Sequence, residues 1–349
     1  MTAAAQRILA LNSLDARYGS TYRFRALAEL LRSAGFPVTV LEGEGPAVTR
    51  LARALVAACG SYDVLFTQKF NPVTMAAMLV ARLRGCPVLV DWDDLDPGLQ
   101  GSRARRWLAT LCELVGPRLA SSITTHSEPI RTRARAAGRP THLVPQGFDD
   151  ALFRPDPAGR AAARARLGLA STDVAVGHLC TFTHGGLLDL PVILDAWQRL
   201  ATPEIRFVLI GGGPLEPQVH AALRARGLSG RTRVTGLLPH DEVPAALRSL
   251  DVGVVYMSES AANRARISFK VIEYLALDVP VVGQVVGETA RLFGHLVVAA
   301  DAACLPTDIR RVARAPRGPA TAAAGAPWAW RRARPALRAA LGSLPDGTP

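Results

Sequence analysis

The stretch RARISFKVIEYLALDVPVVG, from Arg264 to Gly283, decides how the rest of the chain is interpreted. Ser268 is a residue type that often begins a helix, so Lys270 falls in the first helical turn and Glu273 lies one turn later on the same face. The apolar residues between them would pack on a sheet, and the PVV at positions 280–282 is typical of a buried strand. The stretch therefore predicts a helix followed by a strand of an α/β fold.

The charged residues of this stretch point to a ligand. A lysine in the first turn opposes the helix macrodipole, and a bound phosphate would remove that conflict. Lysine occurs only at Lys69 and Lys270, in a chain that otherwise uses arginine. Glu273 stands among apolar residues, where an unpaired carboxylate is costly. We expect Lys270 and Glu273 to bind a ligand. For Arg264 and Arg266 a solvated surface position is slightly favoured, because arginine is abundant throughout the chain.

The bulk composition is that of a two-domain globular protein. The chain has 349 residues, of which 49% are hydrophobic and 20% charged, which is enough for two separate cores. Its net charge of +12 would suit a phosphorylated ligand or an anionic membrane surface. The arginines are not interleaved with aromatic residues, so we expect no nucleic-acid partner.

The cysteines and the apolar segments indicate the compartment. Five widely spaced cysteines form no CxxC pair, which is typical of buried thiols in a reducing compartment and argues against a zinc site. We find neither the pattern of a signal peptide nor eighteen consecutive uncharged apolar residues. We expect a cytoplasmic protein, and its basic charge leaves peripheral contact with the inner face of the membrane open.

Both halves of the chain alternate short apolar strands with helical segments. We expect strands at residues 7–12, 37–41, 63–68, 87–91, 122–125 and 141–144, and then at 174–179, 206–210, 233–235, 252–255 and 280–282. Between the two sets, prolines cluster in PQGFDDALFRPDP, at 145–157. The pattern predicts two tandem Rossmann-like domains with parallel sheets and a cleft between them, at residues 1–150 and 151–325, followed by a C-terminal helix and tail at 326–349.

Four segments carry a resemblance to a known family. They are VPQGFDDALFRP at 144–155, FVLIGGGP at 207–214, RVTGLLPHDEVPAALRSLDVGVV at 233–255, and SFKVIEYLALDVPVVG at 268–283. Together they resemble the GT-B fold glycosyltransferases of family 4, from the first strand to about residue 300. The resemblance implies a nucleotide-sugar donor, transfer with retention of anomeric configuration, an N-terminal domain that binds the acceptor and a C-terminal domain that binds the donor.

The resemblance also implies roles for single residues. Glu273 would accept hydrogen bonds from the donor ribose, and Lys270 with Ser268 would lie near the diphosphate. Gly19 and Ser20, after the first strand, would let the backbone approach the donor phosphate and the acceptor. No metal or other cofactor is expected, because fixed donors and cations would stabilise a leaving nucleoside diphosphate.

The chain departs from the family pattern at two places. Ala265 stands eight positions before Glu273, where the family has a second glutamate. The loop after the first strand of the second domain reads TFTHGGLLDL and lacks the usual arginine and lysine. Thr181 or His184 would then contact phosphate, with more of the binding left to Lys270, Arg264 and Arg266.

DWDD, at 91–94, has three interpretations. Its spacing is that of a DxD motif, in which two carboxylates hold a divalent ion. In the resembled family this loop faces the sugar without a metal, so we favour substrate hydrogen bonding by Asp93 or Asp94. Capping of the next helix is the third interpretation. His126 would lie on the cleft side of the first domain, as a substrate-binding or a structural histidine.

The sequence therefore predicts a metal-independent retaining glycosyltransferase. Its donor would be a nucleotide-sugar, UDP- or GDP-linked, and its acceptor a small molecule, a glycan or a lipid-linked sugar. The alternative is a catalytically reduced GT-B protein that binds an active transferase. An NAD-dependent oxidoreductase is disfavoured because GGGP, at 211–214, lacks the spacing of a dinucleotide fingerprint.

Overall fold

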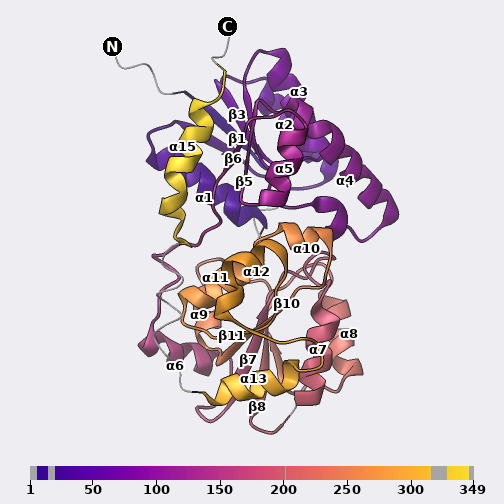
Figure 1. Cartoon of the computed structure of the whole chain (residues 1–349), viewed down its shortest axis with the longest axis vertical. Coiled ribbons are helices and arrows are strands. Elements are labelled where there is room, and N and C mark those ends of the chain that lie inside the picture. Colours follow the sequence, from indigo (N-terminus) through magenta and orange to yellow (C-terminus); the bar gives the residue numbers. More distant parts are fainter. Residues whose placement is uncertain (1–5, 15–19, 201, 316–327, 346–349) are drawn as a thin grey trace. The chain divides into compact units, whose positions relative to one another are not determined.

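The computed structural model describes residues 6–14, 20–200, 202–315 and 328–345. The chain forms two compact units (Figure 1). The first unit comprises residues 1–147 and 330–349, and the second comprises residues 148–329. The C-terminal segment therefore belongs to the same unit as the N-terminus.

The first unit is built on a parallel sheet of six strands, in the order β2-β1-β3-β4-β5-β6. The strands are β1 (Ile8–Leu11), β2 (Val38–Leu41), β3 (Val64–Gln68), β4 (Val88–Asp91), β5 (Ser122–Thr125) and β6 (Thr141–Leu143). The helices are α1 (Ser20–Ser33), α2 (Ala47–Ala58), α3 (Pro72–Leu83), α4 (Arg103–Val115), α5 (Glu128–Ala136) and α15 (Arg334–Gly342), with short 3-10 turns η1 (Asp96–Leu99), η2 (Gly116–Leu119) and η5 (Trp330–Ala333). The side chains of β1, β3, β4 and β5 are buried throughout, as expected for a sheet covered on both faces.

The second unit has a parallel six-stranded sheet in the order β12-β11-β10-β7-β8-β9. The strands are β7 (Val174–Leu179), β8 (Ile205–Ile210), β9 (Thr232–Val234), β10 (Val252–Tyr256), β11 (Val281–Gln284) and β12 (Val297–Ala299). The helices are α6 (Pro157–Arg166), α7 (Leu190–Leu200), α8 (Glu216–Ala225), α9 (Val243–Arg248), α10 (Ala261–Ala265), α11 (Phe269–Ala276), α12 (Gly287–Phe293) and α13 (Leu305–Arg314), with η3 (Gly294–Leu296). This strand order is that of a doubly wound dinucleotide-binding sheet.

The predicted α/β fold with two parallel sheets is confirmed, and each of the eleven predicted strands is present within one or two residues of its expected ends. The sequence analysis missed β12 and α13. The apolar side of α13 consists of Leu305, Ile309 and Val312, all buried. The arginines between these residues make the segment resemble a charged run, which hides the helical spacing of the apolar positions. No helix of the described ranges has both the length and the apolar content needed to cross a bilayer.

Candidate functional site

The second unit has a pocket at the place where its strand order reverses. β7 and β10 are neighbours in the sheet although β8 and β9 lie between them in sequence, so the chain leaves the two strands in opposite directions. Such a point, beyond the carboxyl ends of the strands, is where open α/β sheets bind ligands. A pocket of about 360 Å3, part of which is open solvent, lies there and is lined by His178, Asp189, Asn263, Arg266, Ser268 and Lys270, among others.

Tyr274 fixes helix α11 against the sheet beneath this pocket. Its buried hydroxyl accepts a hydrogen bond from the backbone N–H of Leu179, at 2.9 Å, at the end of β7. Its ring lies against Gly253 of β10, where a Cβ atom would come within 2.8 Å of the ring. The absence of a side chain at Gly253 therefore lets α11 approach the sheet, and this contact sets where Lys270 and Glu273 stand.

Ser268 occupies the N-cap position of α11 as predicted, but its hydroxyl makes no capping hydrogen bond. Its backbone N–H instead donates to the Thr289 hydroxyl at 3.0 Å, and that hydroxyl donates to the carbonyl of Arg266 at 2.9 Å. Thr289 thus holds the entry to the helix from α12. The Ser268 side chain, buried at the pocket wall, is not used as a cap.

Burial shifts the pKa values of Lys270 and Glu273 toward each other. Burial is the main reason that the pKa of Lys270 is lowered to about 8; the nearby Arg266 acts in the same direction, whereas Cys180, Asp189 and Glu273 act to raise it. Burial raises the pKa of Glu273 to about 7 against the influence of Lys270. The charged forms of both groups are costly in this surrounding, so an anion beside Lys270 would favour its protonated form.

Several polar residues of the pocket, among them His178 and Asn263, were not predicted as site residues. His178, inside β7, has its Nδ1 2.8 Å from the carbonyl of Val254, so Nδ1 is the donor and Nε2 is left as an acceptor. Burial, with help from Lys270, lowers the pKa of His178 well below its usual value, so the ring is neutral. Asn263 of α10 donates to the Ser258 carbonyl at 2.8 Å and to the Asp189 carboxylate at 3.2 Å. It thereby ties the segment after β10 to the segment after β7.

The two predicted arginines lie in different surroundings. Arg266 lines the pocket. Arg264 is exposed, and its Nε lies 2.7 Å from a carboxylate oxygen of Glu259, which is also exposed. The short helix α10 ends between them, so two residues of separation place the side chains on different sides. The geometry therefore favours Arg266 over Arg264 as a ligand contact.

The loop after β7 reaches the pocket through glycines. Gly185 and Gly186 line it, whereas Thr181 and His184, which were predicted to contact phosphate, do not. His184 is exposed. A Cβ atom on Gly186 would stand 2.0 Å from the Thr181 carbonyl oxygen, so this close turn requires glycine. At Gly185 and Gly186 the loop can therefore offer a ligand its backbone, and not the side chains of Thr181 and His184 that were expected.

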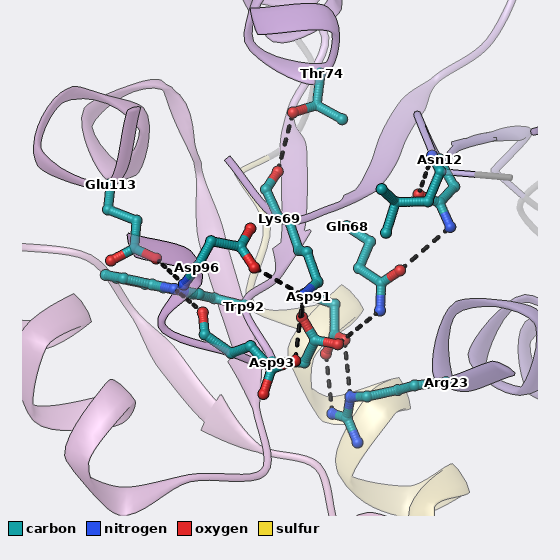
Figure 2. A network of polar contacts seen from close by, with 12 residues as sticks. Asn12, Arg23, Gln68, Lys69, Thr74, Asp91, Trp92, Asp93, Asp96 and Glu113 are labelled. Atoms are coloured by element: carbon teal, nitrogen blue, oxygen red, sulfur yellow. Dashed lines mark hydrogen bonds and ion pairs between the residues drawn. The ribbon is translucent and has the colours of Figure 1, made fainter. Parts of the chain in front are cut away.

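A second polar cluster lies in the first unit at the carboxyl ends of β1, β3 and β4 (Figure 2). At its base Arg23 and Asp91 form a bidentate ion pair, with Nε to Oδ2 at 2.8 Å and Nη2 to Oδ1 at 2.9 Å, and both side chains are fully buried. Thr124 also donates to Asp91 at 2.8 Å. Arg23 also donates to the Val144 and Pro145 carbonyls and to the side-chain oxygen of Gln146. Asp91, the first carboxylate of DWDD, is therefore a structural residue.

Lys69 stands among the other carboxylates of this cluster (Figure 2). Its ammonium lies 3.5 Å from Asp93, 3.2 Å from Asp94 and 2.9 Å from Asp96. Burial lowers the pKa of Lys69, but the three carboxylates outweigh it and raise the pKa well above its usual value. The backbone of Lys69 has a φ of 61°, a strained conformation of the kind found at functional sites. The carboxylates that a DxD motif would offer to a cation are thus already held by Lys69 and Arg23.

Asp93 keeps one oxygen without a hydrogen bond. Its Oδ2 accepts from the Gln68 amide at 3.0 Å, and Gln68 in turn accepts from Asn12 at 3.2 Å. Its Oδ1 is buried and makes no hydrogen bond to the described residues, although Lys69 is near. Burial raises the pKa of Asp93 to about 8 against the influence of Lys69. Capping is not its role, because the next α-helix, α4, is capped by Ser102.

Two of the remaining predicted residues, His126 and Ser20, lie among the described residues of the first unit. His126, after β5, is buried and has a polar contact of its own. Ser20 is the first residue of α1. Gly19 falls outside the described residues. Lys69, Gln68 and Asn12 were not predicted as site residues, although the position of Lys69 after a strand and the rarity of lysine were available signals.

Comparisons with known proteins match both units. The family described as glycosyl transferase 4-like domain matches residues 43–147, and the family glycosyl transferases group 1 matches residues 175–315. A 2-deoxystreptamine N-acetyl-D-glucosaminyltransferase of Streptomyces fradiae is 27% identical over 231 residues, which is 61% of this chain and 52% of that protein. A 2-deoxystreptamine glucosyltransferase of Streptomyces kanamyceticus is 30% identical over 188 residues, which is 51% of this chain and 49% of that protein. The chain spans about half the length of these curated relatives.

Solved structures match over nearly the whole chain. HepE of Anabaena in complex with UDP-glucose has a TM-score of 0.73 and 17% identity, covering 97% of this chain and 100% of that chain. Sucrose-phosphate synthase of Thermosynechococcus elongatus has a TM-score of 0.70 and 18% identity, covering 96% and 95%. At these identities the likeness is one of fold.

Proposed function

We propose that this chain, which belongs to the GT-B fold glycosyltransferases with a 4-like first domain and a group 1 second domain, transfers a sugar from a nucleotide-sugar donor with retention of anomeric configuration. The observation that carries the proposal is the pocket at the β7–β10 reversal. It brings Lys270, Arg266 and Ser268 to one wall, with Glu273 buried one helical turn behind Lys270.

The chemistry of the pocket fits a leaving nucleoside diphosphate. Departure of a diphosphate builds negative charge on its oxygens, and fixed cations and N–H donors stabilise that charge without reorganisation. Lys270 and Arg266 supply positive charge, and the backbone at Gly185 and Gly186 can approach the phosphates closely because it carries no side chain. The transfer we propose uses these groups and no metal ion.

Glu273 is proposed to orient the donor ribose. An ionised carboxylate accepts hydrogen bonds from two neighbouring hydroxyls, which is the arrangement a ribose presents. We propose a UDP-linked donor ahead of a GDP-linked one, since the matching HepE structures hold UDP or UDP-glucose. Neutral His178, with its Nε2 free to accept, adds a second polar group to the pocket.

The acceptor is proposed to bind at the first unit's cluster around Asp93 and Asp94. Asp94 and Asp96 are partly exposed, with 23% and 19% of their side-chain surface accessible, so the cluster reaches solvent there. Lys69 balances one of the three surrounding carboxyl groups, and Asp93, whose pKa is raised to about 8, is mostly protonated at pH 7. A hydroxylated acceptor that also carries amino groups would complement the negative charge that Lys69 does not balance. The matched Streptomyces enzymes are named for 2-deoxystreptamine. We therefore propose a small aminocyclitol acceptor ahead of a glycan or a lipid-linked one.

A ligand panel tests the donor assignment. UDP-, GDP- and TDP-sugars are added to the full chain in a thermal-shift assay, with and without a chelator. A ligand at 100 times its Kd stabilises the folded state by about 2.7 kcal/mol, which gives a clear shift. We expect the UDP-sugars to shift the unfolding temperature and the chelator to leave that shift unchanged. A chain that responds to none of them contradicts the proposal.

Replacing Glu273 by alanine is expected to raise the donor KM and lower kcat together. Loss of a charged hydrogen-bond partner amounts to about 1.5–3 kcal/mol, or roughly a 10- to 150-fold fall in kcat/KM. Steady-state kinetics with varied donor measure it. Glu216→Ala, a half-buried carboxylate in the first turn of α8, is the matched control. Equal kinetics in the Glu273 variant and the control would remove Glu273 from the site.

Release of nucleoside diphosphate by the wild type separates an active transferase from the alternative, a catalytically reduced GT-B protein.

The pH dependence of kcat/KM for the donor follows from the shifted pKa values of Glu273 and Lys270. Glu273 must be ionised to accept the ribose hydroxyls, so kcat/KM for the donor should fall below its raised pKa of about 7. Lys270 must be protonated to hold the diphosphate, so kcat/KM should fall above its lowered pKa of about 8. The expected profile is a narrow bell between the two. Lys270→Arg should move the alkaline limb upward, because arginine stays charged. An alkaline limb that does not move in this variant assigns it to another group.

A further inference from the structure

Helix α4 of the first unit exposes an apolar face. Trp107, Leu108, Leu111, Leu114 and Val115 are 68%, 41%, 39%, 63% and 39% exposed. At 3.6 residues per turn these positions fall within an arc of about 120° along one side of the helix. We name these five residues the α4 face. A helix on the surface of a globular protein normally turns such a stripe inward, and α4 turns it outward.

Residues of α4 outside the α4 face attach the helix to the first unit. Cys112 is buried, and the carboxylate of Glu113 turns inward to accept the backbone N–H of Asp96 at 2.7 Å. The helix therefore packs on the unit through residues outside the α4 face. In the described part of the chain, nine of the eleven exposed large apolar side chains lie on α2, α3 and α4, five of them in the α4 face. In Figure 1, α4 lies at the margin of the first unit.

The charges around the α4 face are positive. Arg103, Arg105 and Arg106 are exposed in the first turns of α4, and Arg118 is exposed just beyond its end. The one acidic residue of the helix, Glu113, is engaged with Asp96, so no carboxylate is exposed along α4. The whole chain carries a net charge of +12.

We propose that the α4 face is a membrane-docking surface that lies in the interface of an anionic lipid bilayer. A stripe of tryptophan and leucine flanked by arginine is the arrangement of helices that lie in the plane of a membrane, where the apolar side enters the acyl boundary and the cations meet lipid phosphates. A second copy of the chain would bring two highly positive molecules together, which charge repulsion opposes. The surface is a protruding helix face, and anionic lipid complements both its apolar and its basic parts.

Vesicle sedimentation with the full chain tests this surface. We expect binding to vesicles of phosphatidylcholine mixed with phosphatidylglycerol, and at least about tenfold weaker partitioning to phosphatidylcholine alone, because several arginines each contribute attraction to anionic lipid. Leu111→Asp should lower partitioning at least about tenfold, since it places a charge in the apolar stripe. Leu188→Asp, which changes a similarly exposed leucine of the second unit, is the matched control and should bind as the wild type does.

Quenching by brominated lipids gives a measurement that needs no destabilising variant. Trp107 is exposed, so its fluorescence should be quenched when the wild type binds brominated anionic vesicles. Trp107→Phe should still bind but lose that quenching. Thermal unfolding of Leu111→Asp, in which only an exposed residue is changed, should match that of the wild type.

Three results would overturn the proposal. They are no binding of the wild type to anionic vesicles, equal binding by Leu111→Asp and Leu188→Asp, and a concentration-dependent dimer that Leu111→Asp dissociates in the absence of vesicle binding. The last would assign the face to a second copy. No donor or acceptor is added in these experiments, so they fail or succeed independently of glycosyl transfer.

Discussion

Replacing Arg23 by methionine is expected to lower the free energy of unfolding by about 3–5 kcal/mol, because it leaves the fully buried carboxylate of Asp91 without its cation. Thr124 would still donate to Asp91, but one neutral hydrogen bond does not compensate a buried charge. The backbone carbonyls of Val144 and Pro145 would lose their donors as well. Thermal and denaturant unfolding followed by circular dichroism measure the change.

The control for Arg23 is an ion pair at the surface. Arg53 lies 3.3 Å from Glu44, with 42% and 72% of the two side chains exposed, and such pairs contribute about 0–1 kcal/mol. Arg53→Met should therefore unfold nearly as the wild type does. The double variant Arg23→Met with Asp91→Leu should recover part of the loss, since no charge is left unpaired. Equal stability of the Arg23 and Arg53 variants would show that the buried pair does not hold the sheet to α1.

Replacing Lys270 by alanine is expected to lower kcat/KM for the donor by about 10²–10³-fold, the usual cost of removing one preorganised group from a developing anion. The effect should appear mainly in kcat, because the interaction strengthens as the diphosphate leaves. Stability should not fall, since burial already disfavours the lysine's charge, as its lowered pKa shows. Steady-state kinetics and thermal unfolding of the same variant measure the two quantities.

Arg224→Ala is the control for Lys270. Arg224 is an exposed cation in the last turn of α8, so it tests a loss of positive charge away from the pocket. Its kcat/KM should stay within about twofold of the wild type, because exposed charges are screened beyond the Debye length. A Lys270 variant as active as the Arg224 variant would remove the cation from the proposed mechanism.

Two of the site residues that the sequence predicted in the second unit, Lys270 and Glu273, share one helix. Lys270 and Glu273 could be placed on the same side of α11 because helical periodicity is local. Arg264 and Arg266 could not be separated in this way, since α10 ends between them and turns one toward Glu259 and the other toward the pocket. Thr181 and His184 were chosen by side-chain chemistry, while the turn brings glycine backbone to the pocket.

The sequence by itself determined the two α/β units, the eleven strands that it predicted and the helix with Lys270 and Glu273, because each depends on apolar spacing within one or two dozen residues. Only the tertiary structure decided which charges meet. Arg23 and Asp91 are 68 positions apart, and Lys69 lies 25 from Asp94. Their contact depends on β1, β3 and β4 lying side by side, and that order is settled by long-range packing of the sheet, on which local spacing has no bearing.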